Sequence, residues 1–179
     1  MVESIRLHVW TMRLAFILVA LFLIFLRLLP LNTATPLWTG PNLLLALTMA
    51  FAVRRPEYLP SLHVALIFLL EDLLLQRPPG LFALMVLIGS ETLKSRSRAR
   101  HEQNFLMEWL SVSASLFGIL FVYRFVLTVL LVPQAPLGLA IMQFVFTLLA
   151  YPFVVGAAHI VVGLRKATPA EMDGMGRSQ

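Results

Sequence analysis

Four ionisable side chains interrupt stretches that are otherwise apolar, and they are the residues best placed to do chemistry. They are Arg27, Glu71, Asp72 and Arg124. A charged side chain within a bilayer is costly, so its presence there is a functional hypothesis by default. Pairing either acid with Arg27 or Arg124 would offset that cost, although neighbours about 100° apart on a helix cannot both face one partner. Two interpretations stay open: a structural pairing that fixes the helix arrangement, and a site that also contacts a partner helix or a polar ligand.

A second set of ionisable residues is expected near the opposite ends of the helices: His63, Glu91, Glu108 and His159. Such side chains can bind zinc, but none of these pairs has the three- or four-residue spacing that aligns ligands on a helix. Interfacial hydration, or pairing of Glu91 or Glu108 with nearby basic residues, explains them more simply. The sequence also lacks H-E-x-x-H, G-x-S-x-G, P-loop and dinucleotide-binding motifs. We therefore predict no metal site, no cofactor, no catalytic residues and no enzymatic activity.

The composition places these residues in a membrane protein. Of 179 residues, 59% are apolar and 13% charged, and none is cysteine, whereas a soluble domain has roughly 45–50% apolar and about 25% charged residues. These values exclude a water-soluble enzyme, a disulfide-stapled secreted fold and a thiolate metal site. Nucleic-acid binding is also excluded despite a pI of 10.4, because no aromatic platform or binding fold accompanies the charges.

Six apolar stretches predict an all-α, polytopic fold with six transmembrane helices, at residues 14–31, 38–53, 59–75, 81–93, 105–132 and 139–164. About 20 residues are needed to cross a bilayer, so the second to fourth are short. They would begin in flanking residues, lie in a thinned bilayer or be shielded by protein. Pro152 and Gly156 predict a kink in the last helix. Residues 1–166 are expected to form one domain, and residues 167–179 a short disordered cytoplasmic tail.

The distribution of basic residues predicts the orientation. In a six-helix arrangement, eleven of the 14 lysines and arginines fall on one side, which the positive-inside rule makes cytoplasmic, together with both termini. Four of them, Lys94, Arg96, Arg98 and Arg100, are expected to form a basic cytoplasmic loop. A purely topological role is favoured, and the alternative is binding of anionic lipid headgroups or an acidic partner.

Small residues four positions apart predict close helix packing. Ala46 and Ala50 form such a pair in one helix, and another helix has two such pairs, Ser111 with Ser115 and Ala114 with Gly118. Small side chains let two backbones approach closely within a membrane. We expect these faces to serve helix association.

The order of several segments resembles that of the rod-shape-determining MreD family in its alphaproteobacterial form. The segments are Gly40-Pro41-Asn42, Arg54-Arg55-Pro56-Glu57, Glu71-Asp72, Arg77-Pro78-Pro79-Gly80 and Tyr151-Pro152. Members of that family often have a glycine ahead of the aspartate of the third helix. This chain has Leu69, Leu70 and Glu71 there, which leaves the role of Asp72 open.

The resemblance implies a non-catalytic subunit of the bacterial cell-elongation (rod) complex in the inner, cytoplasmic membrane. Such a subunit docks the transmembrane helix of MreC, and directly or through MreC it meets RodA, the class B penicillin-binding protein and MreB. It thereby coordinates peptidoglycan synthesis and maintains cell shape. The fold implied is similar to the substrate-binding subunits of energy-coupling-factor transporters. A different function remains as an alternative, a small-solute-binding or transport subunit, suggested by the buried charges and the kinked helix.

Overall fold

The computed structural model describes residues 2–29, 39–99 and 104–162, and within these ranges the regular secondary structure is helical, without a strand. The elements are α1 (Val2–Leu28), α2 (Leu43–Arg54), the 3-10 helix η1 (Pro56–Tyr58), α3 (Ser61–Leu74), α4 (Leu81–Ala99), α5 (Phe105–Val129) and α6 (Leu137–Val162). The predicted tail at 167–179 lies outside the described residues, as does Arg100 of the predicted basic loop.

Three segments are long and apolar enough to cross a membrane: Leu7–Leu28, Phe105–Val129 and Leu137–His159. They lie in α1, α5 and α6, so these helices give the chain the character of a membrane protein. By contrast, α2 has 12 residues and a length of about 18 Å, well below the roughly 30 Å of a bilayer core.

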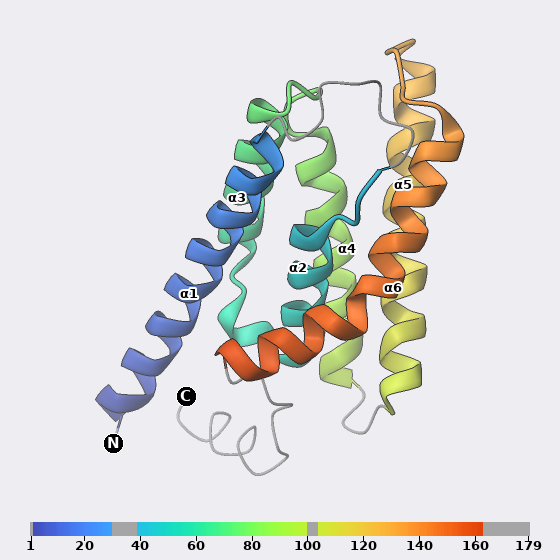
Figure 1. Cartoon of the computed structure of the whole chain (residues 1–179). Helices are drawn as coiled ribbons and strands as arrows, with labels where there is room; N and C mark the ends of the chain where they lie inside the picture. Colours follow the sequence, from blue (N-terminus) through green and yellow to red (C-terminus); the bar gives the residue numbers. More distant parts are fainter. Residues whose placement is uncertain (1, 30–38, 100–103, 163–179) are drawn as a thin grey trace.

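Protein surrounds α2 on nearly all sides. Nine of its twelve residues are buried, and it packs against α4 and α6. Figure 1 shows α2 in the middle of the molecule, with α1 and α3 to one side and α5 and α6 to the other. The ring of Phe51 packs on Phe16 of α1, with 5.1 Å between centroids. Of the three explanations for a short apolar helix, shielding by protein therefore applies to α2.

The ends of α3 and α5 share one capping geometry. Gln76 and Leu131 adopt positive φ angles of 53° and 54°. The N–H of Arg77 donates to the carbonyl of Asp72 at 2.9 Å, and the N–H of Val132 donates to that of Leu127 at 3.0 Å. A left-handed residue with this six-residue hydrogen bond is a Schellman motif, which usually contains glycine. The motif ends α5 three residues earlier than its apolar pattern predicts.

The expected basic loop is largely helical, which corrects the prediction for Lys94, Arg96 and Arg98. Helix α4 continues to Ala99 rather than ending at Leu93. No glycine or proline follows Leu93 to stop it, and its added turns are anchored. The Lys94 ammonium is buried and donates to the carbonyl of Leu59 at 2.6 Å and to Glu91 at 2.7 Å. This cation is therefore a packing element, whereas Arg96 is exposed.

Helix α6 contains Pro152, and Figure 1 shows that its C-terminal half turns away from its N-terminal half and crosses below α2. Proline lacks the N–H that would bond to the preceding turn, and its ring clashes with that turn. The bend places Tyr151 in the core, where it is fully buried. Helix α1 differs more from expectation, because it begins at Val2 rather than at Leu14.

Candidate functional site

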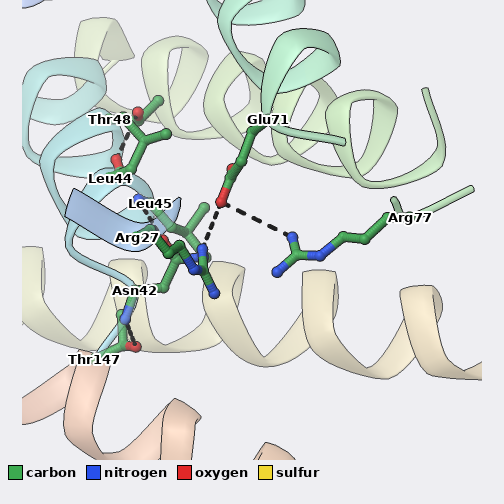
Figure 2. A network of polar contacts seen from close by, with 8 residues as sticks. All are labelled: Arg27, Asn42, Leu44, Leu45, Thr48, Glu71, Arg77 and Thr147. Atoms are coloured by element: carbon green, nitrogen blue, oxygen red, sulfur yellow. Dashed lines mark hydrogen bonds and ion pairs between the residues drawn. The ribbon is translucent and has the colours of Figure 1, made fainter. Parts of the chain in front are cut away.

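Glu71 is the centre of a charge cluster at one end of the helices. Its carboxylate is fully buried. Arg27 of α1 donates from Nη1 to Glu71 Oε1 at 2.5 Å, and Arg77, in the turn after α3, places its Nη1 3.9 Å from the same oxygen. Figure 2 shows the two guanidinium groups approaching Glu71 from different sides. We call these three residues the Arg–Glu–Arg cluster. The expected pairing of Arg27 with an acid is thus present, and sequence reasoning missed Arg77 because it assigned that residue to a turn.

Asp72 has a different role from the predicted one. It pairs with neither Arg27 nor Arg124; its Oδ2 accepts hydrogen bonds from the backbone N–H groups of Gly80 and Ala83, both at 3.1 Å. These donors belong to the start of α4, whose first N–H groups have no partner within the helix. A carboxylate there satisfies two donors and faces the positive end of the helix dipole. Asp72 is therefore the cap of α4.

Arg124 does not join the cluster, which corrects the prediction of a single layer of four charges. It lies on α5 partly exposed, and its Nη2 donates to the carbonyl of Ala135 at 3.1 Å. The side-chain amide of Gln134 donates to the carbonyl of Arg124 at 3.2 Å. No carboxylate of the described residues forms an ion pair with Arg124. Its guanidinium group is thus held by the backbone carbonyl of Ala135 in the α5–α6 turn.

At the opposite side of the molecule, the C-terminal end of α2, the N-terminal end of α5 and the middle of α6 meet at another buried carboxylate. Glu108 of α5 accepts from Arg54 of α2, at 2.8 Å from Nε to Oε1 and 3.3 Å from Nη2 to Oε2. The hydroxyl of Tyr151 on α6 donates to Oε1 at 3.0 Å. We call these residues the Arg–Glu–Tyr cluster. The basic segment was expected to pair with Glu91 or Glu108; Lys94 of that segment pairs with Glu91 at 2.7 Å, and Glu108 pairs with Arg54 of α2. Nowhere in the described ranges do three metal-binding side chains gather at one point.

The two predicted small-residue faces have different surroundings. Ala46 and Ala50 are fully buried, so α2 uses them inside the protein. On α5, Ser111 donates its hydroxyl to the carbonyl of Met107 at 2.8 Å in its own helix. Ala114, Ser115 and Gly118 line a groove of about 300 Å³ between α4 and α5, here called the α4–α5 groove.

Two glycines define the shape of this groove. A Cβ added to Gly89 of α4 would lie 2.7 Å from Cδ1 of Ile119, so this residue must be small for α4 and α5 to touch. A Cβ added to Gly118 would meet no atom within 4 Å. Gly89 was not among the residues predicted to pack closely, because no small residue stands four positions from it. The groove is therefore closed at Gly89 and open at Gly118.

A larger cavity, of about 350 Å³, lies between α2, α4, α5 and α6. Its polar lining includes Asn42, Arg77, Tyr123, Arg124, Gln134 and Gln143. We call it the Arg-lined cavity. At its edge the N–H of Asn42 donates to the hydroxyl of Thr147 at 2.9 Å, which joins the start of α2 to α6 (Figure 2).

Comparison with known proteins adds no assignment, because no family model, no curated protein and no solved structure matches the chain. The geometry itself separates two kinds of site. The buried carboxylates of Glu71 and Glu108 hold helices together through cations on other elements. The α4–α5 groove and the Arg-lined cavity are two spaces that can receive another molecule.

Proposed function

We propose that this protein is a non-catalytic scaffold of the MreD type in the bacterial cytoplasmic membrane, with six spans and both termini in the cytoplasm. The C-terminal ends of α2 and α4, whose sequences contain Arg54, Lys94 and Arg96, lie at the end of the molecule opposite the C-terminal ends of α1 and α3, where the Arg–Glu–Arg cluster is (Figure 1). The positive-inside rule favours the cytoplasm for that end. In this arrangement α2 crosses inside a sheath of protein and needs no long apolar run of its own.

The observation that carries the proposal is the open end of the α4–α5 groove. Helices associate closely in lipid where small residues let their backbones approach. Ala114 is exposed, and the space beside Gly118 is empty. Ala46 and Ala50 are already enclosed, so the available face is on α5. The proposed occupant is the single transmembrane helix of MreC, through which RodA, the class B penicillin-binding protein and MreB are positioned for cell-wall elongation.

The test is retention of MreC by the tagged, detergent-solubilised chain. Gly118→Leu fills the open part of the groove and should reduce the retained MreC about tenfold, as expected for loss of roughly 1.4 kcal/mol of binding free energy. Gly156→Leu is the matched control, because Gly156 also lies in a long helix with open space around it, but outside the groove.

Melting of both variants shows whether each remains folded. Equal retention of MreC by wild type and by folded Gly118→Leu would refute docking in this groove. Failure of the wild-type chain to retain MreC would refute the scaffold function itself.

A further inference from the structure

The Arg-lined cavity carries charge of one sign. Two of its lining residues, Arg77 and Arg124, are cations, and none of the lining residues that the structure describes is aspartate or glutamate. The nearest carboxylate to Arg77 is that of Glu71, which Arg27 already engages at the shorter distance of 2.5 Å. A guanidinium group has five N–H donors, and Arg124 uses one of them on the carbonyl of Ala135. The negative charge of Asp72 also acts on Arg77, whereas Arg124 forms no ion pair with a described carboxylate. The cavity therefore has N–H donors that the protein does not use and, at Arg124, a positive charge without a carboxylate partner.

Both arginines are held in place by contacts that leave donors free. The guanidinium of Arg77 lies over the ring of Phe82, 4.9 Å from its centroid, and the Phe82 ring contacts that of Tyr123 at 5.4 Å. The backbone around Arg124 is fixed by Gln134, whose amide also bonds to Thr128 at 2.9 Å. Rigid cations lose little entropy on binding, which favours recognition of an anion.

The remaining polar lining supplies neutral groups. Within the part of the chain that the structure describes, neither the hydroxyl of Tyr123 nor the side-chain amide of Gln143 makes a hydrogen bond. Both line the cavity. A ligand oxygen between the two arginines could accept from either group. The site thus combines two charged donors with two neutral donors.

The other lining is apolar. Leu45, Leu116, Ile119 and Phe144 form this part of the cavity wall. An inorganic anion alone would leave these side chains against empty space or water. A ligand with a charged head and an apolar body matches both parts of the lining.

We propose that the Arg-lined cavity binds an amphipathic phosphate, with the phosphate group between Arg77 and Arg124 and the apolar body along Leu116 and Ile119. Arginine matches phosphate because its planar fork can donate two parallel hydrogen bonds. A volume of about 350 Å³ is near the lower end of ligand pockets, so it accepts a headgroup and the first part of a chain. The proposal does not rest on the scaffold function, because the Arg-lined cavity and the α4–α5 groove are distinct spaces whose described lining residues have only Ile119 in common.

The experiment measures binding to the full chain in neutral detergent with three probes. Dioleoyl phosphatidylglycerol carries both a phosphate and chains, dioleoylglycerol has the same chains without phosphate, and inorganic phosphate has no chain. Native mass spectrometry counts the bound molecules. We expect phosphatidylglycerol to bind and dioleoylglycerol not to bind. Binding of inorganic phosphate as well would support the site with a free phosphate as its ligand, and its failure to bind would support a lipid source.

Arg124→Gln should weaken binding of phosphatidylglycerol about tenfold, as for loss of one charge-assisted contact. Arg96→Gln is the control for attraction of the headgroup to the basic segment, because Arg96 lines the α4–α5 groove and not the Arg-lined cavity; it should leave binding at the cavity unchanged. Ala140→Leu narrows the cavity without changing a charge and should also weaken binding, which keeps the test valid if Arg124→Gln fails to fold. Equal affinity in wild type and in the folded cavity variants, or loss only in Arg96→Gln, would overturn the proposal.

Discussion

Replacing Glu71 by glutamine is the sharpest test of the Arg–Glu–Arg cluster. Glutamine keeps the shape of the side chain and removes its negative charge. Arg27 and Arg77 then face each other across a neutral amide, with side chains that are only 28% and 23% exposed. The amide N–H₂ group also replaces one acceptor of the carboxylate by a donor.

The expected loss is large because the carboxylate is fully buried. Removing one partner of a buried ion pair costs about 3–5 kcal/mol, since it leaves the other charge uncompensated. Both arginines retain some access to polar surroundings through their long side chains. We therefore expect a loss of about 3 kcal/mol, which is roughly a hundredfold in the unfolding equilibrium.

The assay is reversible unfolding in mixed micelles, followed by tryptophan fluorescence as the denaturing detergent increases. Glu57→Gln is the control, because its ion pair with Arg55 is longer, at 3.3 Å, and its side chain is 26% exposed, so a smaller loss of about 1 kcal/mol is expected. The double variant Glu71→Gln, Arg27→Met should regain part of the lost stability, because an apolar side chain then replaces the uncompensated cation. A loss in Glu71→Gln no greater than in Glu57→Gln would refute the reasoning.

Three other predictions use the same unfolding assay. Asp72→Ala removes the acceptor of two N–H groups and should cost about 2 kcal/mol, whereas Asp72→Asn should recover over half; equal losses would contradict the capping role. Gly118→Ala should add about 0.5–1 kcal/mol of stability through helix propensity, while Gly89→Ala should destabilise because its Cβ would lie 2.7 Å from a side chain of α5; the reverse order would be inconsistent with the groove. Tyr151→Phe should cost about 1.5–3 kcal/mol, because it removes a hydrogen bond to the Glu108 carboxylate, and an unchanged transition would argue against that bond.

The sequence was sufficient to predict helices at six places, because apolar runs separated by proline and glycine define them. It was less informative about where helices end. The chain at Gln76 and Leu131 turns with positive φ in residues that rarely adopt it, so the end of α5 had no visible signal. The extension of α4 depends on a hydrogen bond from Lys94 to Leu59, 35 residues away, which local pattern cannot reveal.

The hardest feature to predict was which face of each helix is enclosed by protein and which is exposed. In a soluble protein an apolar face points to the core, but a membrane helix can be as apolar toward lipid as toward its neighbours. Ala46 and Ala50 therefore looked the same as Ala114 and Gly118, although the first pair is enclosed and the second lines a groove. The Arg–Glu–Tyr cluster was missed for a related reason, since its three residues come from three helices.

Contacts in the folded chain decided which buried acid pairs with which arginine, and residue spacing alone could not show those contacts. The pairing of Arg27 with Glu71 was one of four combinations open to the sequence. Asp72 pairs with neither arginine, because its carboxylate accepts hydrogen bonds from the N–H groups of Gly80 and Ala83. These nearby donors have no partner within their own helix and bind the carboxylate in preference to a distant arginine. Arg124 pairs with neither acid, because the turn after α5 brings the carbonyl of Ala135 to its guanidinium group.

The enclosure of α2 has a consequence for how the protein is made. Helix α6, one of its two main neighbours, leaves the ribosome about 100 residues later, which at roughly 5–20 residues per second is a delay of about 5–20 s. During that interval α2, which is too short to cross the bilayer by itself, is covered by only some of the helices that later enclose it. In a nascent chain stalled before α6, Tyr151 would be missing from the Arg–Glu–Tyr cluster, so Arg54 and Glu108 would be incompletely covered. Membrane quality-control proteases could recognise this exposed face of α2. The enclosure of α2 is thus complete only after α6 has been synthesised and has packed against it.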